Sequence, residues 1–131
     1  MVVTHTMNVF GERQTPEKFI PLCIRRIANG ETISIHADST RTKAGSRFYI
    51  HATDVADAIL FILLNNPNSS DDFGGAKCKK FNIVGKEEVD NLAVATMIAQ
   101  AQGKPLIHEM VDFHTSRPGH DMRYALSGDL M

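Results

Sequence analysis

Three short segments of this sequence carry side chains that could bind an anion. The first covers residues 8–18, in which Gly11 is followed by a helical turn that starts with Pro16. Backbone N–H groups and polar side chains at such a turn suit a carboxylate or a phosphate. A simple capped turn accounts for the same residues, and the spacing alone favours that interpretation.

The second segment covers residues 47–51, in which polar and apolar side chains alternate. On a strand, Arg47, Tyr49 and His51 would share one face, because successive side chains point to opposite sides. Such a face suits a phosphorylated ligand, since a guanidinium group offers phosphate oxygens a planar fork of donors. A solvent-facing strand side is the alternative, and spacing does not decide between the two.

The third segment covers residues 117–124, with the sequence RPGHDMRY. Its Pro-Gly pair forces a turn, which crowds two arginines, a histidine and an aspartate into a small volume. This arrangement could clamp a diphosphate. A salt-bridged surface loop is the commoner outcome of such a cluster, so the residues alone leave both interpretations open.

The 131 residues have the composition of an ordinary globular domain and a formal net charge of −1. This charge gives no reason to expect a nucleic acid or a membrane surface as a partner, so any anion site must be local. No apolar run is long enough to span a bilayer, and residues 1–5 lack the basic start of a secretory signal. Because Cys23 and Cys78 make no disulfide framework, we expect a reduced, cytoplasmic protein.

A metal site is not predicted. His114 and His120 come closest to a ligand spacing, but no third candidate ligand stands out, and zinc needs three or four. No motif supports a Ser/His/Asp triad. The chain also has no Gly-rich turn between a strand and a helix, the element that holds a dinucleotide pyrophosphate. We therefore predict no metal-binding and no cofactor-binding residue.

Strands and helices are predicted to alternate, which favours an α/β fold, or α+β for an isolated lobe. Alternating or β-branched segments predict strands at residues 2–10, 32–36, 47–51, 81–84 and 106–113. Apolar periodicity and end signals predict helices at residues 21–28, 55–64 and 91–101.

The ends of these elements follow from local signals. A proline deep in a helix breaks it, so the first helix is expected to begin at Pro21. Residue 53 or 54 is expected to cap the second helix, and Gly103 lies just past the third. We expect a mobile surface loop at residues 38–46, the least ordered stretch at residues 65–75, and a polar loop from residue 114 onward.

In their sequences and in their order along the chain, these segments resemble the C-terminal half of one protein family. This family is the extended short-chain dehydrogenases, and the resemblance is to its NAD-dependent nucleotide-sugar epimerase and dehydratase branch. Residues 8–21 are similar to its NxYGxxQxPEKxIP segment, and residues 47–56 to its RDxxxVxDxxxA strand and helix start. Residues 81–83 resemble its YNIG strand, and residues 117–124 are close to the RPGHDxRYA signature of sugar 4,6-dehydratases. The resemblance implies that residues 1–131 form a single substrate-binding lobe, truncated at both ends. It would be a partial Rossmann-like domain without the N-terminal dinucleotide-binding half.

The resemblance also implies a binding site for a nucleotide-diphosphate sugar. It places Asn8 near the diphosphate, Lys18 and Phe19 along the nucleotide, Arg47 and Arg117 on the diphosphate with Asn91 and His120 beside them, and Ser34 and His36 at the base.

The sequence departs from the family pattern at several positions. His5 stands where the family has Arg, and Phe48 replaces the Asp that follows Arg47. Ser34 and His36 replace the Pro and Tyr that pack around the base, so the identity of the base stays open. The Tyr-x-x-x-Lys pair does not occur, and we expect no catalytic residue in this chain. NAD is the cofactor of the parent family, whose sugar 4,6-dehydratases are lyases.

Three functions remain open at this stage. The chain could be part of an enzyme that pairs with a missing dinucleotide-binding lobe, and would then expose an apolar surface that favours a homo-oligomer. It could be a stand-alone module that binds nucleotide-diphosphate sugars. It could also be a structural or oligomerisation domain with a decayed site.

Overall fold

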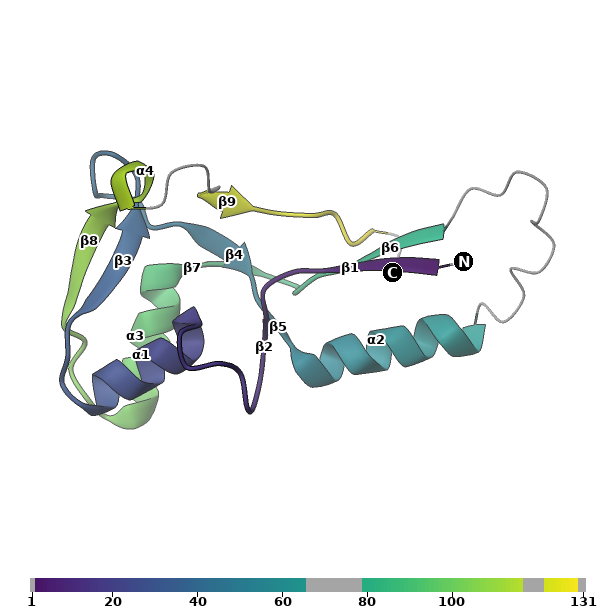
Figure 1. Ribbon diagram of the computed structural model, residues 1–131, viewed down its shortest axis with the longest axis horizontal. Coiled ribbons are helices and arrows are strands. Elements are labelled where there is room, and N and C mark those ends of the chain that lie inside the picture. Colours follow the sequence, from purple (N-terminus) through teal and green to yellow (C-terminus); the bar gives the residue numbers. More distant parts are fainter. Residues whose placement is uncertain (1, 66–78, 117–121, 130–131) are drawn as a thin grey trace. The chain divides into compact units, whose positions relative to one another are not determined.

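Strands alternate with helices through most of the chain, as Figure 1 shows. The computed structural model describes residues 2–65, 79–116 and 122–129. These residues divide into two units, each with its own core. Unit 1 comprises the described parts of residues 1–11, 48–87 and 125–131, and unit 2 those of residues 12–47 and 88–124.

Unit 1 contains two parallel strand pairs and one helix. Strand β1 (Val2–Thr6) pairs with β6 (Lys79–Ile83), and β2 (Val9–Phe10) pairs with β5 (Ile50–His51). Helix α2 (Ala52–Asn65) follows β5 directly. It packs on the strands through a narrow stripe, because only Ile62 among its residues is fully buried. The core of unit 1 consists of Ile50, Ile62 and Ile83, with Val2, Val9, Val55, Ala58 and Phe81 packed against them.

The outer face of α2 is apolar and exposed. Its large side chains are solvent-accessible to between 36% and 77%, far more than an apolar core allows. We call this surface the α2 outer face; it consists of Ile59, Leu60, Phe61, Leu63 and Leu64. None of the described helices is long and apolar enough to cross a membrane.

Unit 2 is built on a parallel pair of strands covered by two helices. Strand β3 (Ile33–Ala37) pairs with β8 (His108–Asp112). Helices α1 (Phe19–Ala28) and α3 (Asn91–Gln102) pack against each other and against β3, and the short α4 (Phe113–Ser116) lies beside both strands. The buried core consists of Cys23, Ile27, Ile33, Ile35, Ala44, Ala95 and Ala99.

A small second sheet in unit 2 positions the candidate site. Its strand order is β7 (Glu88–Asp90), β4 (Ser46–Phe48) and β9 (Arg123–Tyr124), and Ser46 lies opposite Arg123. Asp90 ends β7 and caps α3, because its carboxylate accepts the N–H of Ala93 at 2.7 Å. This cap joins the sheet directly to the start of the longest helix of unit 2.

Two predicted strands are broken in the structure. The strand predicted at residues 2–10 is interrupted by Met7 and Asn8, and Asn8 has a positive φ of 45°. The strand predicted at residues 47–51 breaks at Tyr49, which separates β4 from β5. The pairing changes at this point, because β4 pairs with β7 and β9 whereas β5 pairs with β2. The backbone of Gly85 also approaches Tyr49 closely, since a Cβ on Gly85 would lie 2.0 Å from the Tyr49 carbonyl oxygen. Tyr49 and His51 both lie edge-on to the ring of Phe10, with 6.5 Å and 5.2 Å between the ring centroids. That Arg47 shares a face with them stays a prediction.

Two helix starts also differ from the prediction. Helix α1 begins at Phe19, and Pro21 lies in its first turn. A proline is tolerated there, because the first N–H groups of a helix have no acceptor within it. Helix α2 begins at Ala52, upstream of both predicted caps. The ring of His51 provides a hydrogen-bond acceptor at the N-terminus of α2, since its Nδ1 accepts the N–H of Thr53 at 3.3 Å.

The remaining elements agree with the sequence to within a few residues. Strands β3, β6 and β8 and helix α3 lie where they were predicted, and Gly103 ends α3 with a φ of 61°. Beyond residue 113 the chain forms α4 and β9, where only a loop was predicted. Of the predicted loop at residues 65–75, only Asn65 is described, and it ends α2.

Candidate functional site

Three of the predicted site residues meet around Gly45 in unit 2. The N–H of Gly45 donates to the carbonyl oxygen of His36 at 3.0 Å, and its own carbonyl accepts the N–H of Asn91 at 2.9 Å. A Cβ built on Gly45 would lie 3.8 Å from both Arg47 Nη1 and Asn91 Nδ2, and 3.0 Å from the carbonyl oxygen of Met122. The absence of a side chain at Gly45 therefore lets these residues approach one another.

Arg47 links two strands of the small sheet. Its partly buried Nη1 donates to the carbonyl oxygens of Ser46 at 2.7 Å and Met122 at 2.5 Å. The first acceptor belongs to β4, and the second directly precedes β9. Arg47 thus brings a positive charge to the site and also fixes the backbone around it.

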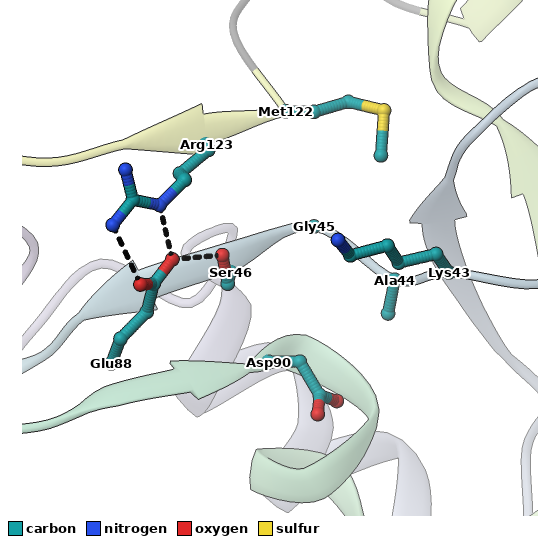
Figure 2. A pocket seen from close by; sticks show the side chains of 8 residues that line it. All are labelled: Lys43, Ala44, Gly45, Ser46, Glu88, Asp90, Met122 and Arg123. Carbon is teal, nitrogen blue, oxygen red and sulfur yellow. Dashed lines mark hydrogen bonds and ion pairs between the residues drawn. The ribbon is translucent and has the colours of Figure 1, made fainter.

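A cavity of about 460 Å³ opens beside this sheet, which is within the usual size of a small-molecule site. Figure 2 shows the side chains that line it, from the loop before β4, from β4, β7 and β9. The lining combines two cations, two carboxylates and a hydroxyl with apolar atoms. The residues are Lys43, Ala44, Gly45, Ser46, Glu88, Asp90, Met122 and Arg123.

Glu88 is the most highly connected side chain of the cavity. It accepts two bonds from Arg123, at 2.8 Å from Nε and 2.9 Å from Nη2, and a third from the Ser46 hydroxyl at 2.5 Å. The bonds from Arg123 and then from Ser46 lower the pKa of Glu88 to about 2. In return, Glu88 raises the pKa of Arg123. This group connects β7, β4 and β9.

The loop before β4 is organised around Asp38. Its Oδ1 accepts the N–H groups of Thr42 at 2.9 Å and Lys43 at 3.1 Å, and its Oδ2 accepts the Thr40 hydroxyl at 2.8 Å. The N–H of Lys43 is the main cause of a lowered pKa for Asp38, followed by the Thr40 hydroxyl. An isolated bridge between Ala37 and Ala44 closes the loop. The segment predicted as a mobile loop therefore has a defined set of bonds.

The other predicted residues of unit 2 lie outside this cavity. Lys18 is exposed and precedes α1, whereas Phe19 packs on the core. Ser34 donates to Glu109 at 2.6 Å across β3 and β8. The ring of His36 lies edge-on to Phe113, with 5.8 Å between the ring centroids. Only the backbone of His36 contributes to the arrangement around Gly45.

Asn8 belongs to unit 1, and its Nδ2 is buried without a hydrogen-bond partner among the described residues. Buried donors of this kind are rare in folded proteins, so this amide is a candidate to bind a ligand or a partner. Arg117 and His120 lie outside the described residues, and their predicted roles stay predictions.

The sequence interpretation missed Glu88, Ser46 and Lys43 as lining residues. Glu88 lies on a strand of only three residues, which is too short to show a period. Lys43 was assigned to a featureless loop. Arg123 stands in the predicted anion-binding segment, and its cationic chemistry was the one available signal for this cavity.

The described residues include no group of three His, Cys, Asp or Glu side chains that could hold a metal ion. Cys23 is fully buried in the core of unit 2. Burial raises the pKa of its thiol to about 11, although the charge of Arg26 acts in the opposite direction. Cys23 is therefore a packed, protonated thiol, not a reactive one.

Comparison with known proteins decides the family. The model of the NAD dependent epimerase/dehydratase family matches residues 1–76, more than half of the chain. The chain belongs to this family. Among curated members it is 34% identical over 125 residues to the low-salt glycan biosynthesis protein Agl12 of Haloferax volcanii, covering 95% of the chain and 36% of that protein. It is 32% identical over 126 residues to a dTDP-glucose 4,6-dehydratase of Streptomyces niveus, covering 96% of the chain and 33% of that protein.

Solved structures of family members match the fold of this epimerase/dehydratase chain. A dTDP-glucose 4,6-dehydratase from Bacillus anthracis in complex with NAD superposes with a TM-score of 0.73 and 29% identity, over 98% of the chain and 36% of that structure. A UDP-glucose 4-epimerase from Thermus thermophilus in complex with NAD gives a TM-score of 0.77 at 24% identity, over 98% and 38%. The predicted family and α/β fold class are thus confirmed. The chain spans about a third of the length of the curated relatives named above.

Proposed function

We propose that this chain is the nucleotide-diphosphate-sugar binding lobe of an NAD-dependent sugar 4,6-dehydratase or epimerase, and that it does not catalyse the reaction by itself. The observation that carries the proposal is the cavity beside Gly45, where Arg47 and Asn91 lie near a lining that contains Lys43 and Arg123. Several cations around a diphosphate give charge-assisted hydrogen bonds, which are stronger than bonds between neutral groups.

The proposed role of the chain is to orient the sugar. Orientation removes translational and rotational freedom before the chemical step, and it can supply a large part of the rate acceleration. In this proposal Arg47, Arg117, Asn91 and His120 hold the diphosphate. Asn8, in the other unit, stays a proposed substrate contact. Lys18, Phe19, Ser34 and His36 remain the proposed contacts to the nucleotide.

NAD, the cofactor named in the structures of the relatives, does not fit the described residues of this chain. A dinucleotide pyrophosphate needs a glycine turn that joins a strand to a helix N-terminus. Helix α2 follows β5 with no glycine between them, and α3 follows β7 with Asp90 as its cap. Helix α1 follows a turn in which the N–H of Lys18 donates to Thr15 at 3.0 Å. We therefore propose that a separate dinucleotide-binding lobe holds NAD.

The α2 outer face is the proposed contact surface for that lobe. Parallel sheets in α/β proteins are covered on both faces and usually contain more than two strands. Among the described residues of unit 1, β1 and β6 form a sheet of only two strands, and helix α2 exposes Leu64 to 77%. A lobe that covered this face would remove the apolar surface from water. A homo-oligomer formed through the same face is the alternative.

Ultracentrifugation tests this surface. We expect the chain alone to self-associate, because the α2 outer face is free, and the double variant Leu60→Lys, Leu64→Lys to be monomeric. A matched double variant of exposed polar residues, Thr53→Lys and Asp57→Asn on the same helix, produces the same change in net charge and serves as the control. A wild-type chain that is monomeric at all concentrations would contradict an interface on this face.

Calorimetric titration with dTDP, UDP and GDP tests the binding function. We expect binding with a Kd on the order of micromolar for one base, and its loss in Arg47→Ala and Arg117→Ala. Arg25→Ala is the matched control, because Arg25 is an exposed arginine on α1, outside the cavity. Far-UV circular dichroism of each variant separates a lost contact from a lost fold. Absence of binding to all three nucleotides would refute the proposal.

An activity assay tests the second part of the proposal. We expect no conversion of dTDP-glucose by the purified chain with NAD present. Formation of a keto sugar by this chain alone would show that it carries catalytic groups that the proposal assigns to another lobe.

A further inference from the structure

The polar side chains that line the cavity are occupied, with one exception. Glu88 binds both Arg123 and Ser46, and Asp90 accepts the N–H of Ala93. The ammonium group of Lys43 makes no hydrogen bond or ion pair with any described residue. Lys43 interacts with Glu88 electrostatically, and this interaction is the smallest of the causes that shift the pKa of that carboxyl. Among the described side chains that line the cavity, Lys43 is therefore the one with its bonding capacity available for a ligand.

The backbone of Lys43 is fixed from both sides. Its N–H donates to the Asp38 carboxylate at 3.1 Å, and its carbonyl accepts the N–H of Asp38 at 3.0 Å. Figure 2 shows the side chain extending from this loop toward Gly45, with its ammonium nitrogen drawn beside that glycine. A backbone anchored in this way reduces the conformational freedom that a ligand contact would have to freeze.

A phosphate in this cavity would need a second cation besides Arg47, because two carboxylates line the cavity. Glu88 and Asp90 line it and would repel a phosphate, although Arg123 and the start of α3 offset their charges. Arg47 lies beside Gly45, two residues after it, and Lys43 lies two residues before it. These two cations flank the same glycine and are suited to two linked phosphates.

We propose that Lys43 binds the second phosphate of a nucleoside diphosphate, so that the site selects diphosphates over monophosphates. This inference rests on the proposed nucleotide-sugar binding function and adds a residue outside the segments that resemble the family. An ammonium group suits the task, because it is a compact charge with three donors and needs no fixed plane of acceptors.

The experiment compares diphosphate and monophosphate binding by calorimetry, with the base that the wild-type chain prefers among thymidine, uridine and guanosine. We expect wild type to bind the diphosphate roughly tenfold more tightly, the contribution of one charge-assisted bond. Lys43→Ala should bring the two affinities to within about twofold, by weakening the diphosphate and leaving the monophosphate unchanged. Lys43→Arg should restore most of the preference.

Lys86→Ala is the matched control, since Lys86 is exposed and lies outside the cavity lining. It should keep the full preference for the diphosphate. A Lys43→Ala chain that still prefers the diphosphate overturns the role of Lys43 and leaves the proposed function standing. If Lys86→Ala lost the preference for the diphosphate to the same extent, net charge would explain the result. That outcome also overturns the role of Lys43. A wild-type chain that binds neither nucleotide overturns both the inference and the proposed function.

Discussion

Substitution of Gly85 by alanine should destabilise the chain more than an alanine at any other glycine that the structure describes. A Cβ on Gly85 would lie 2.0 Å from the carbonyl oxygen of Tyr49 and 2.8 Å from its carbonyl carbon. Carbon and oxygen atoms in weak contact stay about 3.3 Å apart, so the two segments would have to separate by roughly 1 Å. Both clashing atoms belong to the backbone, and no side-chain rotation can relieve them. Overpacking typically costs 1–3 kcal/mol, and we expect about 3 kcal/mol here.

Urea unfolding monitored by far-UV circular dichroism measures this loss. Two other glycines provide controls. Gly11→Ala places its Cβ 3.2 Å from the Ala52 methyl group, and we expect a cost below about 1 kcal/mol. Gly30 has open space around it but a φ of 71°, so Gly30→Ala should cost about 1 kcal/mol from backbone strain alone. A Gly85→Ala chain within about 1 kcal/mol of wild type would refute the steric constraint between Gly85 and the backbone of Tyr49.

Three further predictions concern unit 2. Stability provided by Glu88 should be complete above its unfolded pKa and lost as the pH falls toward about 2, and Glu88→Gln should lack this part of the pH dependence of the urea midpoint. Ile35 is fully buried, so Ile35→Ala should lower the free energy of unfolding by about 3 kcal/mol and Ile35→Val by about 1 kcal/mol, measured by urea titration. Asp90→Ala removes the cap of α3 and should cost about 1 kcal/mol, whereas Asp90→Asn, which keeps an acceptor, should restore most of it.

Elements with strong local signals could be predicted from the sequence. Helix α3 combines a run of apolar residues with Gly103 just past its end, and both signals lie within the segment itself. Strand β3 alternates buried Ile33 and Ile35 with the exposed Ser34, which is the expected pattern for a half-covered strand. In both cases the deciding contacts are close in sequence.

Elements decided by distant contacts could not be predicted. The strand period continues through Tyr49 without interruption, but the pairing partners change there, from β7 and β9 beside β4 to β2 beside β5, and these partners are distant in sequence. Strand β7 has three residues and forms because β4 lies beside it. The role of Glu88 depends on that pairing. Nothing in the residues adjacent to Glu88 shows that Arg123 and Ser46 will converge on it.

The candidate site also contains one residue that the sequence predicted and one that it did not. Arg47 belongs to a segment that resembles the family, and in the structure its guanidinium group holds the carbonyls of Ser46 and Met122. Lys43 lies outside the segments that resemble the family, and Asp38 fixes its backbone while its side chain lines the cavity. A residue that holds two strands together cannot change without disturbing the site, whereas a loop cation can. The proposed preference for a diphosphate therefore depends on the residue that resemblance alone would have passed over.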